Sequence, residues 1–570
     1  MTETFAQKLK SWFEEKPSQK AITFVYRKNP QHVVDYHTLL CGAGAYAKAL
    51  EAAHIQPQEV VIIILQHSEA LVYAFWGCVL RGAIPSIMPF LTEKLSPQYY
   101  RRSIQTLLEI TKPAAIITSA EFLGEVQQAL KADCSVRVVL EAAPIVPLTN
   151  EELDDVMNKG KVILRGLAAQ PQDIVLLQHS SGTTGLQKGV ALSHRAVFHQ
   201  LENYSQAIRL NEGDTIVSWL PLYHDMGLIA GFILPLLCGV PLVLMSPFEW
   251  VRAPQLLLQA ISEHHGTLTW LPNFAYHFCS QKIRSADLEG VSLASLRAVI
   301  NCSEPMYKYS HDMFLERFRP YGFREAALAT CYAMAENVFA VTQGGIDEKV
   351  RIDCISKRAF AEQHIAKPVQ EGEEAIYMVS AGKPIPNVEV KVLDQQSRVD
   401  LPQRQVGEIA LRSNCMLSGY YNRLDATAEA FHDGWFLTGD LGYMADDEVF
   451  ITGRKKDLII VGGKNVYSRD LENIVNEVAG IHPGRAAAFG VPNAQSGTED
   501  VAIVAETDEE SPDRREEIAE AVREAIAKNS DVVARYVRIV GRGWLVKTSS
   551  GKVSRSANRE KFLAELQMGE

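Results

Sequence analysis

QHSSGTTGLQKGVALSH, residues 178–194, is the segment on which the interpretation of this chain rests. It follows the apolar run Ile174–Leu177, which predicts a buried strand, and Ser193 is suited to cap a helix that begins near His194. Its glycines allow the backbone to approach a bulky anion closely, and Lys188 adds a cation. We therefore predict the order strand, loop, helix, with a loop that binds a triphosphate.

Hydroxyl and backbone groups of this loop are the candidate ligands of the phosphates. The residues that carry them are Ser180, Ser181, Gly182, Thr183, Thr184 and Gly185. The loop differs from a Walker loop, because Gln187-Lys188-Gly189 stands where Gly-Lys-Ser/Thr is needed. This excludes the Walker-type kinases and GTPases, whereas a plain Ser/Gly-rich surface turn remains the alternative for the loop taken alone.

Composition favours a large soluble protein of several domains. The chain has 570 residues and a net charge of −11, so there is no basic excess for nucleic acid. Its nine cysteines are scattered, odd in number and free of C-x-x-C pairs, which is typical of reduced thiols in the cytoplasm. Leu228–Met245 is long and apolar enough for a membrane span, but Pro235, Gly239 and Pro241 divide it into a buried helix and strand. We therefore expect that the chain is not an integral membrane protein.

An alternation of strands and helices indicates the fold class. Short β-branched runs predict strands at Ala21–Tyr26, Val60–Leu65, Ala115–Thr118 and Val136–Leu140, separated by helices at Tyr36–Ala52, Ser68–Arg81 and Pro97–Thr111. This rhythm predicts an α/β fold of mostly parallel βαβ-type sheets, which bind ligands beyond the carboxyl ends of their strands.

The later part of the chain changes character twice. Residues 345–374 are charged and irregular, as expected of an insertion. Beyond Gly453–Asp457 a compact α+β unit begins, with helices predicted at Asp470–Ala479 and Asp513–Lys528. We predict a large domain over residues 1–456 and a small domain over 457–570.

Single polar residues near strand ends or in polar loops are candidates for the chemistry. Glu336 follows a predicted strand and is suited to face a metal, and Asp440 ends a Gly-rich turn that is suited to bind a ribose diol. Each candidate has a plain alternative: His224 as a core histidine, Asp440 as a turn cap, and Lys552 as part of a solvated basic loop.

Taken together, the motifs resemble those of the adenylate-forming superfamily, which contains acyl-CoA synthetases, luciferases and peptide-synthetase adenylation domains. They appear in the family's order at Ser180–Gly189, Pro221–Leu228, Ser303–Pro305, Tyr332–Glu336, Thr438–Asp440, Gly453–Asp457 and Ser550–Lys552. Residues 271–276, residues 379–386 and the extra stretch after Glu336 make fatty acyl-AMP ligases the most similar subfamily.

This resemblance implies ATP and Mg²⁺ as cofactors and gives each motif a role. Residues 180–188 would hold the β- and γ-phosphates, and Thr184 and Glu336 would place Mg²⁺. The adenine site would be lined by Ser303, Glu304, Pro305, Tyr332, Ala333 and Met334. Asp440 would bind the ribose with help from Arg454. Gln187 departs from the usual proline of the loop but removes no phosphate ligand.

The resemblance also implies the catalytic and moving parts. His224 would lie beside the reacting carboxylate, and Lys552 would bridge that carboxylate and the α-phosphate. Asp457 would be the hinge about which the small domain rotates after adenylation. An acyl pocket would be formed by Trp219, Met226, Ile229, Trp270, Phe274 and Ala275, although such residues are also common in a plain core.

The insertion decides the expected acceptor of the acyl group. In fatty acyl-AMP ligases an insertion in this region is thought to disfavour CoA. We therefore expect transfer to the phosphopantetheine arm of an acyl carrier protein, or of a carrier domain in a polyketide or nonribosomal peptide synthase. The alternatives are an acyl-CoA ligase, which shares the adenylation residues, and a nucleotide-binding regulatory protein without catalysis.

Overall fold

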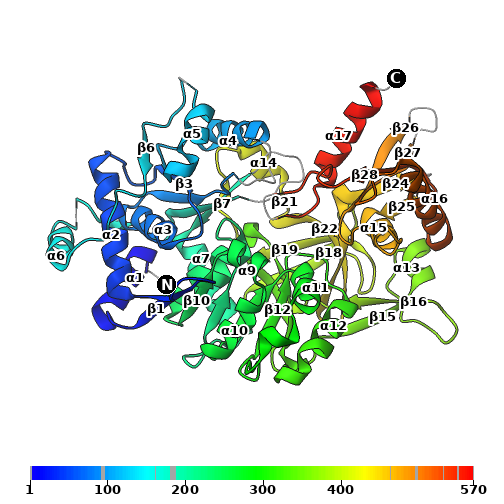
Figure 1. The fold of residues 1–570 in the computed structure, drawn as a ribbon, viewed down its shortest axis with the longest axis horizontal. Coiled ribbons are helices and arrows are strands. Elements are labelled where there is room, and N and C mark those ends of the chain that lie inside the picture. Colours follow the sequence, from blue (N-terminus) through cyan, green and yellow to red (C-terminus); the bar gives the residue numbers. More distant parts are fainter. Residues whose placement is uncertain are drawn as a thin grey trace. The chain divides into compact units, whose positions relative to one another are not determined.

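The computed structural model describes residues 3–91, 97–131, 133–160, 162–179, 188–461, 464–493, 498–530, 532–548 and 551–568 (Figure 1). These residues form two compact units. The first contains the described residues up to 438 together with 442–451, and the second contains 439–441 and the described residues from 452 onward. The boundary predicted at residue 457 falls inside the second unit.

The first unit is built around a nine-stranded sheet of order β17-β14-β13-β12-β11-β9-β10-β1-β2. The strands are β1 (Lys20–Val25), β2 (His32–Asp35), β9 (Ile216–Ser218), β10 (Leu242–Met245), β11 (Leu268–Leu271), β12 (Ala298–Cys302), β13 (Leu328–Ala333), β14 (Ala340–Gly344) and β17 (Lys383–Pro384). From β13 to β1 all neighbours pair in parallel, whereas the pairs at both edges are antiparallel.

A smaller sheet of order β4-β3-β5-β6 is parallel throughout. Its strands are β3 (Val60–Ile64), β4 (Ile84–Ile87), β5 (Ala115–Thr118) and β6 (Val138–Glu141), and its connecting helices include α3 (Glu69–Arg81), α4 (Pro97–Thr111) and α5 (Ala120–Ala129). Helix α2 (Tyr36–Ala52) packs against α3 (Figure 1). The predicted α/β fold with mostly parallel sheets is confirmed.

The triphosphate loop departs from the predicted order of strand, loop and helix. Strand β7 (Ile174–His179) precedes the loop, and a second strand, β8 (Gly189–Ser193), follows it. The two pair antiparallel, and β20 (Gly419–Tyr420) completes a three-stranded sheet of order β20-β8-β7. Helix α7 (His194–Ala207) starts only after β8, where the Ser193 side chain accepts a hydrogen bond from the Ala196 amide. The predicted helix start is confirmed, but the described strands on either side of the loop pair antiparallel with each other.

Residues 345–374 contain regular structure, so their irregular appearance in the sequence was misleading. Strand β15 (Ile352–Ser356) and helix α13 (Lys357–Gln363) lie within this stretch, and β15 pairs antiparallel with β16 (Ala375–Val379). Buried Asp353 accepts hydrogen bonds from Arg404 at 3.0 Å and from the Tyr443 hydroxyl at 2.9 Å. These contacts attach the stretch to the body of the first unit.

An antiparallel sheet of order β18-β19-β22-β21, with β23 beside β22, follows along the chain. Its strands are β18 (Val388–Leu393), β19 (Gly407–Ser413), β21 (Phe431–His432), β22 (Trp435–Ala445) and β23 (Glu448–Arg454). The remaining helices described here are α1 (Phe5–Glu15), α6 (Asn150–Asn158), α9 (Pro247–Arg252), α10 (Gln255–Glu263), α11 (Asn273–Lys282), α12 (Lys308–Phe318) and α14 (Leu424–Glu429).

The second unit is a small α+β fold. It contains the hairpin β24 (Leu458–Val461) and β25 (Lys464–Tyr467) and a sheet of order β26-β27-β28. The other elements are α15 (Ser468–Asn476), β26 (Ala486–Asn493), β27 (Thr498–Thr507), α16 (Pro512–Asn529), β28 (Ala534–Gly541) and α17 (Arg555–Met568). Val475, Ile503 and Val522 are fully buried and belong to its core. The predicted α+β character of this region is confirmed.

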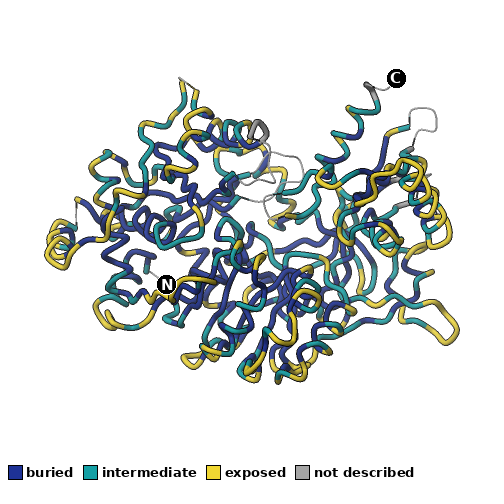
Figure 2. Tube along the Cα trace, viewed as in Figure 1, coloured by how far each residue is buried: buried dark blue, intermediate teal, exposed yellow. Residues whose placement is uncertain are grey.

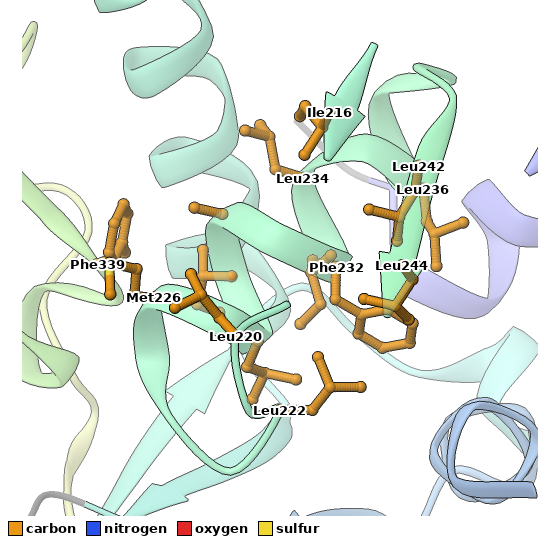
Figure 3. Packing of buried hydrophobic residues seen from close by; sticks show 14 of the residues in the cluster. Ile216, Leu220, Leu222, Met226, Phe232, Leu234, Leu236, Leu242, Leu244 and Phe339 are labelled. Carbon is orange, nitrogen blue, oxygen red and sulfur yellow. The ribbon is translucent and has the colours of Figure 1, made fainter. Parts of the chain in front are cut away.

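The apolar segment 228–245 lies in the core of the first unit (Figures 2 and 3). It forms most of a π-helix (Met226–Ile233), then α8 (Leu234–Cys238) and β10. A Cβ on Gly227 would lie 2.3 Å from the Pro221 carbonyl oxygen, so the close approach of the π-helix requires glycine. In the described part of the chain, each helix is too short or too polar to cross a membrane.

Two buried histidines are held as neutral hydrogen-bond acceptors. His194 Nδ1 accepts from the Phe5 amide at 3.2 Å, and His311 Nε2 accepts from Asn301 at 3.0 Å. Burial lowers the pKa of both imidazoles from 6.5 to about 4. Protonation would break each hydrogen bond and place a charge in the core.

We expect the free energy of unfolding to fall as the pH decreases from about 6.5 toward 4. The unfolded chain binds protons at these histidines first, so each contributes a loss of about 1.4 kcal/mol per pH unit in this window. Urea unfolding at pH 7.5, 6.0 and 5.0 measures the slope. His311→Gln should reduce it, whereas His432→Gln, at an exposed position, should leave it unchanged. An unaltered slope in His311→Gln would contradict this account.

Candidate active site

Three segments that carry predicted site residues lie at or just beyond the carboxyl ends of strands in the nine-stranded sheet. Cys302, the last residue of β12, pairs with Cys331 of β13, so Ser303 follows β12 beside Tyr332, which lies near the end of β13. The segment after β9 reaches the same edge, where Ser303 Oγ lies 3.9 Å from Met226 Sδ. Glu304 turns toward α11 and accepts a hydrogen bond from the Phe274 amide at 2.9 Å. Residues from these separate motifs are therefore brought together.

His224 lies on the loop between β9 and the π-helix. Its Nδ1 is 3.0 Å from Asp225 Oδ1, and the same oxygen accepts a hydrogen bond from the Met226 amide at 2.8 Å. The histidine side chain is 22% exposed, so it is neither a core residue nor fully solvated. Asp225 fixes one ring nitrogen, which leaves Nε2 as the atom suited to contact a ligand.

Glu336 and Lys188 are joined by a residue that the sequence did not single out, Tyr420. The Tyr420 hydroxyl donates to Glu336 Oε1 at 2.8 Å, and the Lys188 ammonium lies 4.5 Å from the centre of the tyrosine ring. Burial, followed by the nearby Glu336 charge, raises the pKa of Tyr420 far above its ordinary value, so the phenol remains a donor. No local sequence signal identifies this contact, because Tyr420 and Glu336 are 84 positions apart.

Backbone strain lies directly after Glu336. Val338 has φ +63° and ψ −53°, and the Phe339 amide donates to the Asn337 carbonyl at 2.7 Å, which closes a tight γ-turn. A β-branched residue at positive φ is rare and costs of order 1–3 kcal/mol. Such strain is typical of functional sites, and here it directly follows the 3₁₀ turn Ala335–Asn337 that contains Glu336.

The base of the triphosphate loop is described on both sides. His179 pairs with Gly189 across β7 and β8, and His179 Nε2 lies 2.7 Å from Ser86 Oγ on β4. Burial lowers the pKa of His179 to about 4, so the ring is neutral at physiological pH. The predicted phosphate ligands Ser180, Ser181, Gly182, Thr183, Thr184 and Gly185 lie outside the described residues.

In the second unit Asp440 and Arg454 form an ion pair. Arg454 Nε donates to Asp440 Oδ1 at 3.0 Å, and the aspartate is 7% exposed. The two predicted ribose residues are therefore in contact with each other. An ionised carboxylate accepts hydrogen bonds only, which is the chemistry that the predicted contact with a ribose diol requires.

Lys552 lies in a short turn that is fixed to α17. The Thr548 amide donates to the Lys552 carbonyl at 2.7 Å, and Lys547 and Val553 form a β-bridge that closes the turn. Buried Asn558 of α17 accepts from the Val546 amide at 2.8 Å and donates to its carbonyl at 2.9 Å. The described residues before and after Lys552 are therefore held by backbone hydrogen bonds and by Asn558.

Five of the six predicted acyl-pocket residues are core residues in this structure. Trp219, Met226, Ile229, Trp270 and Ala275 are at most 4% exposed, whereas Phe274 is 43% exposed. Trp219 stacks on Trp250 with ring centres 3.6 Å apart, and Trp270 Nε1 donates to the Tyr204 hydroxyl at 2.8 Å. Figure 3 shows Met226 near Phe339. Their role in binding an acyl chain stays a prediction.

A small pocket is lined in part by Tyr223, the residue before His224. It is lined by apolar and aromatic residues that include Leu222, Tyr223, Phe90 and Phe248, together with His67, and its volume is about 10 Å³. That is room for one water molecule, so an acyl chain could enter here only if side chains moved.

Comparison with known proteins identifies the family. The model of the family described as AMP-binding enzyme matches residues 9–421. The chain belongs to this family. It is 34% identical over 405 residues to the medium-chain-fatty-acid–[acyl-carrier-protein] ligase JamA of Moorena producens, with 68% of each chain covered. It is 30% identical over 587 residues to the long-chain-fatty-acid–AMP ligase FadD26 of Mycobacterium bovis, covering 97% of this chain and 96% of the relative.

A solved structure supports the same relation. A structure from work on fatty acyl-adenylate ligases of E. coli and L. pneumophila matches with a TM-score of 0.87 and 26% identity, covering 100% of both chains. The prediction from sequence of an enzyme in the adenylate-forming superfamily, most similar to fatty acyl-AMP ligases, is therefore confirmed. The roles assigned to individual residues stay predictions.

Proposed function

We propose that this AMP-binding family member is a fatty acyl-AMP ligase that loads a carrier protein. The observation that carries the proposal is the match to FadD26 over 97% of the chain, together with the match to JamA, whose name gives an acyl carrier protein as acceptor. The enzyme activates a fatty acid with ATP to an acyl-adenylate and passes the acyl group to a phosphopantetheine thiol. Its substrates place it in the cytoplasm.

In the first step a carboxylate oxygen of the fatty acid attacks the α-phosphorus of ATP. The bond from that phosphorus to pyrophosphate breaks, and pyrophosphate leaves with the electron pair. Lys552 contacts both reacting groups through its ammonium, and His224 orients the carboxylate through Nε2. Both groups act by position and charge, so no covalent enzyme intermediate forms.

In the second step the thiol, having lost its proton to solvent, attacks the acyl carbon. The carbon–oxygen bond to AMP breaks, and a thioester and AMP are formed. This step has no pyrophosphate to stabilise and needs space for the phosphopantetheine arm. Rotation at Asp457, which withdraws Lys552, meets that requirement.

The residues around Glu336 suit a magnesium ion that is bound mainly by phosphates. Among the described residues, no group of three or more His, Cys, Asp or Glu side chains is placed to hold a metal. Mg²⁺ commonly takes one or two protein oxygens and completes its shell with phosphates and water, so the single Glu336 carboxylate fits. When bound, Mg²⁺ neutralises charge on the β- and γ-phosphates. Tyr420 holds Glu336 through its Oε1 oxygen, and this carboxylate would be the protein ligand of the ion.

The second candidate, an acyl-CoA ligase, differs only in the acceptor. The stretch 345–374, here seen as β15 and α13, is the feature that favours a carrier protein. A regulatory protein without catalysis has no use for Lys552 and its hydrogen-bonded turn, which argues against that third alternative.

The products of the wild-type enzyme distinguish the acceptors. With ATP, Mg²⁺, a medium-chain fatty acid, CoA and a phosphopantetheinylated carrier protein, we expect acyl-adenylate and acyl-carrier to form and little acyl-CoA. Mass spectrometry of nucleotide, CoA and protein fractions measures all three. Abundant acyl-CoA would show that the chain is an acyl-CoA ligase instead. If no acyl-adenylate formed, the proposed enzymatic activity would be refuted.

Replacing Lys552 tests its role in adenylation. Lys552→Ala should reduce pyrophosphate release by at least about 100-fold while ATP binding persists, because the charge is needed most in the transition state. Lys528→Ala, an exposed lysine of the same unit, is the matched control and should keep wild-type activity. An unchanged rate in Lys552→Ala would exclude this residue from catalysis.

Replacing Tyr420 tests the support of Glu336. Tyr420→Phe keeps the ring under Lys188 but removes the hydroxyl, so the Mg²⁺ concentration for half-maximal activity should rise several-fold and binding of Mg·ATP in calorimetry should weaken. A lost hydrogen bond to a charged group also lowers the free energy of unfolding by about 1.5–3 kcal/mol.

A matched control separates the two effects. Tyr443→Phe removes a hydroxyl that donates to Asp353 at 2.9 Å, away from Glu336. It should reduce stability similarly without changing the Mg²⁺ requirement. The same Mg²⁺ dependence in both variants would refute a role of Tyr420 in positioning Glu336.

A further inference from the structure

Arg555, the first residue of α17, binds two carboxylates from distant parts of the second unit. Its Nε and Nη2 donate to the two oxygens of Glu472 at 2.7 and 2.6 Å, which is the bidentate geometry. Its Nη1 contacts Asp457 Oδ2. One guanidinium therefore connects the predicted hinge residue to α15.

The partners are themselves fixed. Glu472 Oε1 also accepts from the Ala488 amide of β26 at 3.0 Å, and Ser468 Oγ donates to the Asp457 carbonyl at 2.6 Å. The side chains of Arg555, Asp457 and Glu472 are 26%, 15% and 12% exposed, so solvent screens them little. The network thus includes the hinge, α15, β26 and α17.

The turn of Lys552 is attached to the same helix. Arg555 follows Lys552 by three positions, and Asn558, one turn further along α17, holds the Val546 backbone at the other end of the turn. A displacement of Asp457 relative to α17 would break the Arg555 contact. The lysine turn and the hinge are therefore coupled through Arg555.

We propose that Arg555 is a positioning residue for adenylation, which links hinge residue Asp457 to the turn that carries Lys552. The link makes the Asp457 side chain, α15 and the lysine turn move as one body when the unit rotates, so the place of the ammonium follows that of Asp457. This inference rests on the proposed function and deepens it, because it assigns the control of Lys552 to a residue that does not touch the substrates.

A purely structural ion pair is the competing explanation. Buried ion pairs often add little net stability, since the desolvation of the charges offsets their attraction, whereas removal of one partner leaves a costly unpaired charge. Loss of stability alone therefore does not distinguish the two explanations. A selective loss of one half-reaction does.

The two half-reactions are measured separately on the full chain. ATP–pyrophosphate exchange gives kcat and KM for adenylation, and transfer from supplied acyl-adenylate to a phosphopantetheinylated carrier protein gives the second step. Arg555→Gln should lower kcat of adenylation by about tenfold or more through misplacement of Lys552, with KM for ATP and fatty acid within about threefold. Transfer should stay within about threefold of wild type.

Further variants keep the test independent of folding. Arg555→Lys retains the charge but not the bidentate fork, so its loss should be intermediate. Asp457→Asn changes only the charge of the partner. If the two residues act through their contact, the loss of adenylation kcat in the double variant with Arg555→Gln should be smaller than the product of the two single losses. Arg535→Gln removes a pair with Asp500 in the same unit and should keep both half-reactions.

Each outcome is decisive. The positioning role would be overturned if both half-reactions lost activity equally and in step with a lower melting temperature. It would also be overturned if soluble Arg555→Gln and Asp457→Asn kept wild-type adenylation. Failure of the proposed function is seen differently, because then the wild-type chain itself forms no acyl-adenylate.

Discussion

The hydrogen bond from Tyr420 to Glu336 connects two sheets that the chain builds separately. Glu336 leaves β13 of the nine-stranded sheet, and Tyr420 lies on β20, which pairs with β8 at the exit of the triphosphate loop. The Tyr421 amide adds a bond of 2.7 Å to Gly189 at the same place. Backbone pairing of β20 with β8 therefore places Tyr420, and the hydroxyl of this one side chain then holds the Glu336 carboxylate.

In the second unit, too, predicted functional residues are held by hydrogen bonds or ion pairs with their neighbours. The Lys552 carbonyl accepts a hydrogen bond from the Thr548 amide, and Asp440 is oriented by its ion pair with Arg454. Long charged side chains lose rotamer entropy when they are held, so a site that depends on their position gains from such preorganised supports.

Local patterns in the sequence were sufficient to predict much of the fold, but they predicted less of the candidate site. Helix 36–52 and strand 115–118 agree with the structure because periodicity and capping are local properties. The β8 strand was missed because it contains only five residues and is defined by pairing with β7 and β20. Tyr420 and Arg555 were missed for a similar reason, since their partners are far away in the sequence. Burial of Trp219 and Trp270 was equally invisible, because a core and an apolar pocket have the same composition.

Two chemical steps at one acyl carboxylate impose opposite demands on charge. Formation of the acyl-adenylate concentrates negative charge from the carboxylate and the phosphates, so a cation must be close. Attack by a thiol releases AMP without pyrophosphate, and an ammonium in the path of the phosphopantetheine arm would obstruct it. A lysine on a separate compact unit meets both demands if the unit moves as a rigid body. Rigidity then becomes a requirement on the interior of that unit, and we propose that the partly buried contacts of Arg555 with Asp457 and Glu472 supply it.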